Sequence, residues 1–373
     1  MPVLSPNVLA AERVGALHEA HIAARCPRAT VNLSGGIDSA VIACLAVLAI
    51  GADNVTLDHT CLSTSGEQTN RAINLAKALN CKLAVGQFTG TFNVLMEEFG
   101  RSLEAAGFDR DEVDARCAKD PTILGSIRSI FRTTLGRGYN RLTGGGLYHG
   151  TGNECEDRYL RFYQKGGDGE VDSNPIAMLS KGEVYQLALA LANQMGPTVK
   201  AALLPIIGAT PSPDLWGVGD AHSDESELAN WLNAPFTYSR ISVETGEYVK
   251  VGTIERVARF LDLPHEIAGF PEEWTVEKVL FGRHKSSEVT ESIVDTLVAH
   301  ACSHPLFNGT PFSPQTPNVR VGAIPMDIIK ALLMGARKAE AATRHKMNPN
   351  IPTYGDRASL VEAGILTNDL PSI

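Results

Sequence analysis

The sequence lacks features that three broad classes of protein require. It has 33 Lys and Arg against 42 Asp and Glu, a net charge of −9, so it has no basic excess for a nucleic-acid backbone. Its longest apolar run, residues 40–50, is too short to span a bilayer. None of its seven cysteines forms a Cys-x-x-Cys pair, which favours free thiols over disulfides or a zinc site. We therefore expect a cytoplasmic protein with no membrane or nucleic-acid partner.

Strand-like and helix-like segments alternate through the first two thirds of the chain. The expected strands are 30–33, 55–62, 82–88 and 146–150, and the expected helices are 39–50, 67–80, 91–106, 123–137 and one that starts at 180. This alternation predicts an α/β fold, a doubly wound parallel sheet with flanking helices. Further helices are expected near 251–261, 288–301 and 324–344. Residues 107–121, 208–223 and 303–320 are expected to be loops or linkers.

The segment Ser34-Gly35-Gly36-Ile37-Asp38-Ser39 follows the first expected strand and opens a helix. Two glycines let the backbone turn tightly and approach a ligand. The amide groups and dipole of a helix start favour an anion. Asp38 fits such a place if it holds Mg²⁺, which bridges carboxylate and phosphate oxygens. The segment is neither Gly-x-x-x-x-Gly-Lys-Ser/Thr nor Gly-x-Gly-x-x-Gly, so a hydride-transfer enzyme has no support.

This Ser-Gly-Gly-x-Asp-Ser loop resembles that of the N-type ATP-pyrophosphatases, which cut ATP between the α and β phosphates and adenylate a substrate. The stretch from Gly150 to Lys181 narrows the resemblance to ammonia-dependent NAD synthetase. The positions that carry it are Thr151, Glu156, Phe162, Tyr163, Lys165, Asp168, Asp172, Asn174, Pro175 and Lys181. Residues 211–215 with 223–228, and Arg283-His284-Lys285, resemble two later blocks of the family. The resemblance implies an adenine nucleotide alpha hydrolase-like sheet.

The resemblance also implies roles for individual residues. The catalytic residues it suggests are Asp38, Lys181, Asp224 and Glu225. Those for ATP are Ser34, Gly35, Gly36, Asp38, Ser39, Thr151, Lys181 and Ser212. Those for deamido-NAD are Arg128, Phe162, Lys165, Asp168, Asp172, His284 and Lys285.

Asp38 and Glu156 follow neighbouring strands, and parallel strands bring such junctions to one edge of the sheet. Together they could hold the Mg²⁺ of MgATP. The spacing from Glu156 to Lys165 is one residue longer than in the family. Asp157 therefore stays open as the alternative ligand, although Glu156 is preferred for its distance from Gly150 and Thr151.

The expected reaction is amidation of deamido-NAD to NAD, with ATP as co-substrate and an acyl-adenylate intermediate. Only about thirty residues precede the loop, too few for an amidase domain, so free ammonia or a separate partner protein is the expected source of nitrogen. We expect a ligase domain at 1–288, a mostly helical C-terminal extension at 289–373, and a homodimer. The alternatives are another adenylating ligase of the same fold, or an inactive nucleotide-binding protein.

Overall fold

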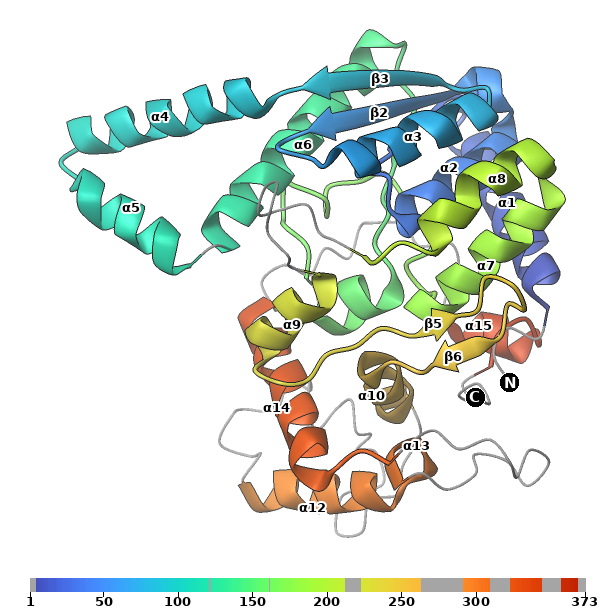
Figure 1. Cartoon of the computed structure of the whole chain (residues 1–373), viewed down its shortest axis with the longest axis vertical. Helices are drawn as coiled ribbons and strands as arrows, with labels where there is room; N and C mark the ends of the chain where they lie inside the picture. Colours follow the sequence, from blue (N-terminus) through green and yellow to red (C-terminus); the bar gives the residue numbers. More distant parts are fainter. Residues whose placement is uncertain are drawn as a thin grey trace.

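The computed structural model of the chain describes residues 5–120, 122–160, 162–211, 223–262, 291–308, 323–343 and 357–367. A four-stranded sheet lies at its centre (Figure 1), with the order β3-β2-β1-β4 and every neighbouring pair parallel. The strands are β1 (Ala29–Asn32), β2 (Val55–Cys61), β3 (Lys82–Gln87) and β4 (Leu147–His149). The predicted α/β fold with a doubly wound parallel sheet is therefore confirmed.

The helices that precede, link and follow these strands cover both faces of the sheet. They are α1 (Pro6–Ala23), α2 (Ile37–Ile50), the short η1 (Ala52–Asn54), α3 (Gly66–Ala78), α4 (Thr89–Ala105), α5 (Arg110–Lys119), α6 (Thr122–Leu142), α7 (Lys181–Gln194) and α8 (Pro197–Ile207). The chain runs outward from β1 to β3 and then returns past β1 to form β4. Because parallel crossovers are right-handed, this reversal puts α6 on the face opposite α2 and α3.

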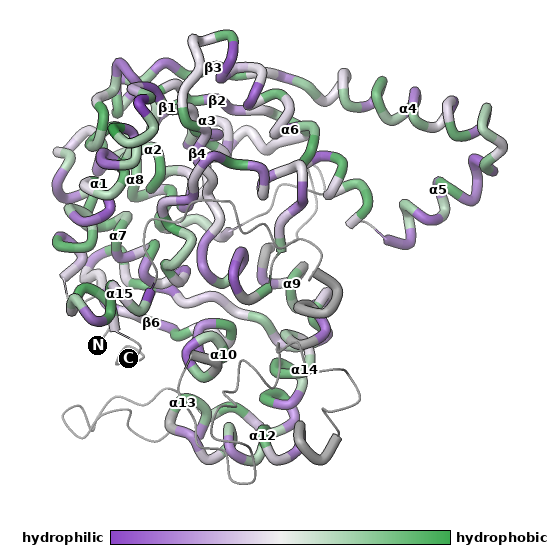
Figure 2. The backbone as a smooth tube through the Cα atoms, turned by 180° about the vertical axis from the view of Figure 1, so that it is seen from behind, coloured by the Kyte–Doolittle hydropathy of each residue, from purple (hydrophilic) through white to green (hydrophobic). Residues whose placement is uncertain are grey.

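The α4–α5 segment projects away from the sheet as an arm (Figure 1). The sequence predicted a loop at 107–121, and that prediction is wrong for Arg110–Lys119, which forms α5. Asp109 caps this helix by accepting from the amides of Asp111 and Glu112, so local capping stabilises it although none of its side chains is buried. Figure 2 shows the contrast between hydrophilic α5 and apolar α2.

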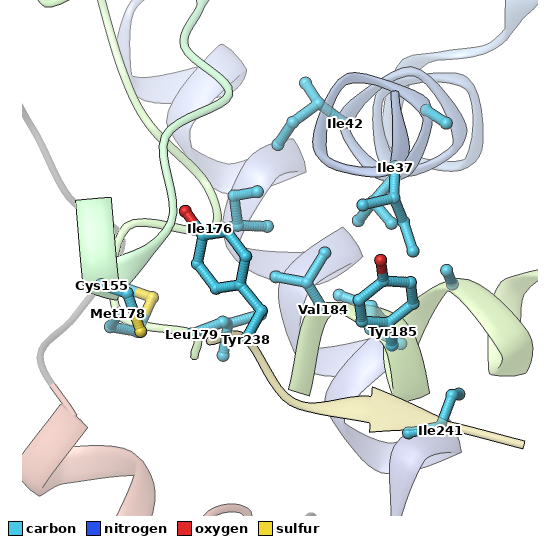
Figure 3. Close-up of a cluster of buried hydrophobic side chains, with 14 of the residues drawn as sticks. Ile37, Ile42, Cys155, Ile176, Met178, Leu179, Val184, Tyr185, Tyr238 and Ile241 are labelled. Carbon is cyan, nitrogen blue, oxygen red and sulfur yellow. The ribbon is translucent and has the colours of Figure 1, made fainter. Parts of the chain in front are cut away.

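A continuous apolar core joins the sheet domain to the C-terminal helices. Figure 3 shows Ile37 and Ile42 of α2 near Val184 and Tyr185 of α7. The same buried cluster continues to Leu297 and other C-terminal side chains. The remaining elements are α9 (Asp224–Leu232), β5 (Arg240–Ile241), β6 (Tyr248–Lys250), α10 (Thr253–Asp262), α12 (Glu291–Ser303), α13 (Pro305–Asn308), α14 (Met326–Thr343) and α15 (Arg357–Glu362). The mostly helical C-terminal region is confirmed, whereas the predicted boundary at 288 lies outside the described residues. None of the described helices is long and apolar enough to cross a membrane.

Candidate active site

The turn after β1 has the geometry of an anion-binding loop. Gly35 has φ +85°, and a Cβ there would lie 2.3 Å from the Gln68 carbonyl oxygen, so this position requires glycine. Gly36 is the N-cap of α2 and has no side chain to cap it. The first amide groups of α2 are therefore available to an anion. Ser34 Oγ lies 3.0 Å from Ser39 Oγ, which holds the two ends of the turn together.

Lys181 stands at the centre of the site. Its Nζ donates to Asp38 Oδ2 at 2.6 Å and to Glu156 Oε1 at 3.3 Å. Glu156 also accepts from the Tyr238 hydroxyl at 2.8 Å, and Lys181 Nζ lies 4.9 Å from the Tyr238 ring centre. Four separate segments of the sequence thus meet near the ends of β1 and β4. The sheet order reverses between these strands, which is the usual ligand position in doubly wound sheets.

Burial raises the pKa of Asp38, while Lys181 lowers it and Glu156 raises it again. Two carboxylates share one ammonium group, so the cluster retains surplus negative charge. Hard oxygen donors with surplus negative charge suit Mg²⁺. The residues present therefore fit the metal, although the described residues hold no group of three His, Cys, Asp or Glu side chains placed to ligate an ion.

Glu156 and Asp157 point to different partners. Glu156 reaches Lys181, whereas Asp157 Oδ2 accepts from Asn174 Nδ2 at 2.6 Å. The segment Cys155–Leu160, labelled η2, is a π-helix, and a π-turn holds more residues than an α-turn. This accounts for the long spacing between Glu156 and Lys165. Both side chains line the cavity, so the choice of Glu156 over Asp157 as the metal ligand remains a prediction.

A cavity of about 390 Å³ opens beside this cluster, within the usual range for small-molecule sites. Predicted residues that line it are Ser34, Asp38, Ser39, Thr151, Glu156, Asp157, Phe162, Tyr163 and Asp168. Gly35, Gly36 and Lys181 are not among the lining residues. Thus the loop, the candidate metal ligands and two predicted substrate residues share one cavity.

The α6 wall of the cavity differs from the prediction. Arg128 does not line the cavity, and its guanidinium lies 5.6 Å from the Phe92 ring centre on α4. Arg132, one helical turn after Arg128, lines the cavity. Ser129 on the same helix donates to Asp168 Oδ1 at 2.7 Å and fixes that carboxylate at the cavity edge.

Two further predicted substrate residues also lie outside the cavity lining. Lys165 is exposed. Asp172 accepts from Arg137 Nη1 and from the Tyr148 amide, both at 2.8 Å, so it fastens β4 to α6. Arg128, Lys165 and Asp172 therefore lie outside the lining of this cavity, and their contacts with deamido-NAD remain predictions.

Residues of the later blocks are described only in part. Glu225 Oε1 accepts from the Tyr238 amide at 2.7 Å and from Arg240 Nη2 at 3.1 Å, so it anchors the segment that carries Tyr238. Asp224 is the first residue of α9. Ser212, His284 and Lys285 lie outside the described residues.

The sequence prediction missed several cavity residues. Trp231 faces Phe162 with ring centres 5.3 Å apart, and both line the cavity. Tyr238 lies 82 positions from its partner Glu156, and no local pattern marks it. The helical spacing from Arg128 could have indicated Arg132.

Two buried polar pairs support the cavity floor. Asn32 donates to Asp58 Oδ1 at 2.6 Å, and burial raises the pKa of Asp58 to about 7 despite the bonds from Asn32 and Thr60. His149 Nε2 lies 3.1 Å from His21 Nε2. Burial lowers the pKa of His149 to about 3, and the neighbouring His21 lowers it in the same direction. The His149 imidazole is therefore neutral at pH 7, which makes it a poor general acid.

The family model described as NAD synthase matches residues 17–241. The chain belongs to the NAD synthase family. Two similar relatives are named NH(3)-dependent NAD(+) synthetase. The protein of Methanococcoides burtonii is 30% identical over 54% of this chain and 66% of its own length. That of Helicobacter hepaticus is 28% identical over 61% of this chain and 74% of its own. The aligned part thus spans about two thirds to three quarters of these relatives.

A solved structure, the NMN synthetase from Francisella tularensis, is also similar. It is 23% identical, with a TM-score of 0.49, over 61% of this chain and 82% of its own. The matched family region ends between β5 and β6. It includes the loop after β1, the α6 wall, Lys181 and Tyr238, so the NAD synthase region contains most of the cavity described above.

Proposed function

We propose that this NAD synthase family member amidates deamido-NAD to NAD, using ATP and ammonia and releasing AMP and pyrophosphate. The observation that carries the proposal is Lys181 Nζ held 2.6 Å from Asp38 and 3.3 Å from Glu156 beside an anion-binding turn. An ammonium group at that place neutralises charge that develops when pyrophosphate leaves.

The reaction follows in two steps. The nicotinate carboxylate of deamido-NAD attacks the α-phosphorus of ATP, the α–β bridging bond breaks, and pyrophosphate departs toward the Ser34–Ser39 turn and Lys181. Ammonia then attacks the acyl carbon, the acyl–phosphate bond breaks, and AMP and a proton leave with NAD. The chain contributes mainly by holding the reactants in place and stabilising charge.

Mg²⁺ is part of this proposal, with Asp38 and Glu156 as its protein ligands. When bound, the ion would neutralise phosphate charge and orient the triphosphate. Phe162 and Trp231 offer aromatic faces for a substrate ring. Arg132 offers a guanidinium for a phosphate or carboxylate. The catalytic roles of Asp224 and Glu225, and the nucleotide contact of Ser212, remain predictions.

We also propose a homodimer formed through the arm of α4 and α5. Val94, Phe99 and Phe108 are 66%, 44% and 54% exposed there, and contiguous exposed apolar side chains are typical of an interface. The acidic charge and free cysteines favour a cytoplasmic enzyme that acts on small molecules, without a membrane or nucleic-acid partner.

The test is an assay that measures all three products from purified full-length protein with ATP, Mg²⁺, ammonium and deamido-NAD. We expect AMP, pyrophosphate and NAD in equal amounts from the wild type, and release of all three about 10³-fold slower from Lys181→Met. Nicotinate mononucleotide and other carboxylates serve as competing substrates. AMP release with one of them but not with deamido-NAD would identify a different adenylating ligase. ATP binding without AMP release from any of them would identify an inactive nucleotide-binding protein.

A further inference from the structure

A buried cluster of charged side chains lies directly beneath the helix start that presents Lys181. Its carboxylates are Glu154, Glu183 and Glu255, and its guanidinium groups are Arg259 and Arg357, all no more than 7% exposed. Arg357 begins α15, so this guanidinium comes from the C-terminal extension, about 175 residues after its partners.

Arg357 grips Glu183 with two parallel hydrogen bonds. Its Nη1 donates to Glu183 Oε2 at 2.9 Å and its Nη2 to Oε1 at 2.8 Å. Nη2 also donates to the Thr367 carbonyl oxygen at 2.7 Å. Such a two-pronged pair fixes the orientation of both groups, which a single hydrogen bond does not.

Glu183 in turn fixes the start of α7. Its Oε2 accepts from the Ser180 amide at 2.8 Å, and Ser180 Oγ accepts from the Glu183 amide, which makes a capping box. Ser180 Oγ also donates to Glu255 Oε1 at 2.6 Å. The next residue is Lys181, so one continuous chain of contacts runs from Arg357 to the buried ammonium group that Asp38 and Glu156 share beside the cavity.

Stability alone gives little reason for such an arrangement. Apolar side chains of similar volume often replace a buried ion pair at no cost, or even stabilise the protein. A buried pair does, however, impose one geometry, and in active sites a displacement of about 1 Å can cost about 10²-fold in rate. Here the imposed geometry is that of the turn that aims Lys181 at Asp38 and Glu156.

We propose that Arg357 is a positioning residue for Lys181, so that residues 357–367 of the C-terminal extension complete the active site. Leu360 and Leu366 of that segment are buried in the common core and hold it in place. The inference rests on the proposed function, because it assigns Lys181 a role in that reaction.

The test compares Arg357→Ala with Arg13→Ala in the full-length protein, below the unfolding temperature of both. Arg13 is the matched control: it is also buried and donates to Pro175 O and Met178 Sδ, while Arg357 donates to Met178 O. The two arginines differ in their carboxylate partner: Arg357 bonds to Glu183, whereas Arg13 pairs with Glu12. We expect Arg357→Ala to lower kcat about 10²-fold and Arg13→Ala to keep kcat within about threefold.

Added guanidinium ion separates positioning from general stability. At matched ionic strength it should restore at least part of the lost kcat in Arg357→Ala and nothing in Arg13→Ala. Should Arg357→Ala not fold, Arg357→Lys replaces it, since it keeps the charge but loses the fork; we expect about a tenfold loss of kcat. Equal kcat in the wild type and the Arg357 variant, or equal losses in both alanine variants without rescue, would overturn the inference.

The ATP dissociation constant, measured by calorimetry, distinguishes failure of the inference from failure of the proposed function. A wild type that releases no AMP rejects the proposed function but can still bind ATP. The positioning of Lys181 is then read from ATP affinity, which should fall about tenfold in Arg357→Ala and stay unchanged in Arg13→Ala. Equal ATP affinity in all three proteins would reject the positioning role.

Discussion

Two charged clusters meet at the first turn of α7, and the same residue types behave differently in them. Above, Asp38 and Glu156 share one Lys181 and are 17% and 21% exposed at the cavity. Below, Glu183 is 4% exposed and bound by the fork of Arg357. Burial and Glu156 raise the pKa of Asp38. Against its own burial, Arg357 and Arg259 lower the pKa of Glu183 to about 2. The difference indicates that a carboxylate held by a two-pronged guanidinium sets geometry, whereas two carboxylates that share one ammonium group beside a cavity are prepared for a ligand.

Lys181→Met should have the largest effect on activity. It tests whether the cluster around Lys181 serves the reaction while the cluster around Glu183 holds the structure. Removing the ammonium group that faces the leaving pyrophosphate should lower kcat about 10³-fold, equivalent to about 4 kcal/mol. Stability should change less than in the Glu183 variant, because the two carboxylates keep access to the cavity. Steady-state AMP release and urea unfolding measure the two effects. Near-normal turnover in the folded variant would show that the cluster around Lys181 does not serve the reaction.

Glu183→Gln should lower stability, and it should also disturb the position of Lys181, because Glu183 forms the capping box at the start of α7. It leaves Arg357 and Arg259 facing a neutral amide, and breaking a buried pair costs about 3 kcal/mol or more. The pKa of Glu183 is lowered to about 2, so its contribution is present above about pH 4.5 and is lost as pH falls toward 2. The stability difference from wild type should therefore narrow as pH falls below 4.5. Urea unfolding at several pH values checks this, and a gap that widens in acid would contradict it.

Asp58→Asn tests a buried carboxyl that belongs to neither cluster. Burial raises the pKa of Asp58 to about 7. The unfolded chain therefore loses this proton at lower pH than the folded protein does, and the stability of the wild type falls as pH rises from about 4 to about 7. Relative to wild type, the variant should therefore gain about 2–3 kcal/mol more stability at pH 8 than at pH 5. Thermal unfolding at the two pH values measures the gain. An unchanged pH dependence would mean that Asp58 stays ionised.

Phe162→Leu should give the smallest effect. Loss of the aromatic face beside Trp231 should raise the KM for the dinucleotide about fivefold, equivalent to about 1 kcal/mol. The KM for ATP should not change, because the phosphate loop lies elsewhere in the cavity. Steady-state kinetics with each substrate varied in turn separates the two values. A matched rise in both KM values would indicate a general loosening of the cavity.

The sheet and the phosphate turn could be predicted because they depend on local patterns. The four strands begin and end within a few residues of their predicted limits. The Ser-Gly-Gly-Ile-Asp-Ser segment forms the expected turn, since Gly35 needs a conformation that few other residues adopt. Lys181 and its capping box also follow from residues next to one another in the sequence.

The missed features depend on contacts between distant segments. Tyr238 meets Glu156 only because the strand pair β5–β6 lies under the cavity, and Arg357 meets Glu183 across 174 positions. Arg128 lies against Phe92 of α4, and Arg132, one turn along α6, lines the cavity; only the packing of α4 on α6 distinguishes the two positions. The α5 helix was missed because it buries no side chains and so shows no apolar periodicity.

The wide turn of η2 has a consequence for how this site tolerates change in length. One extra residue in an ordinary helix would rotate everything after it by about 100° and swing Phe162 away from the cavity. Between Cys155 and Leu160 the π-helix takes up the additional residue locally. The segments before and after it therefore keep their orientation toward the cavity. An insertion beside a reactive carboxylate is thereby confined to the one stretch of backbone that can widen to hold it.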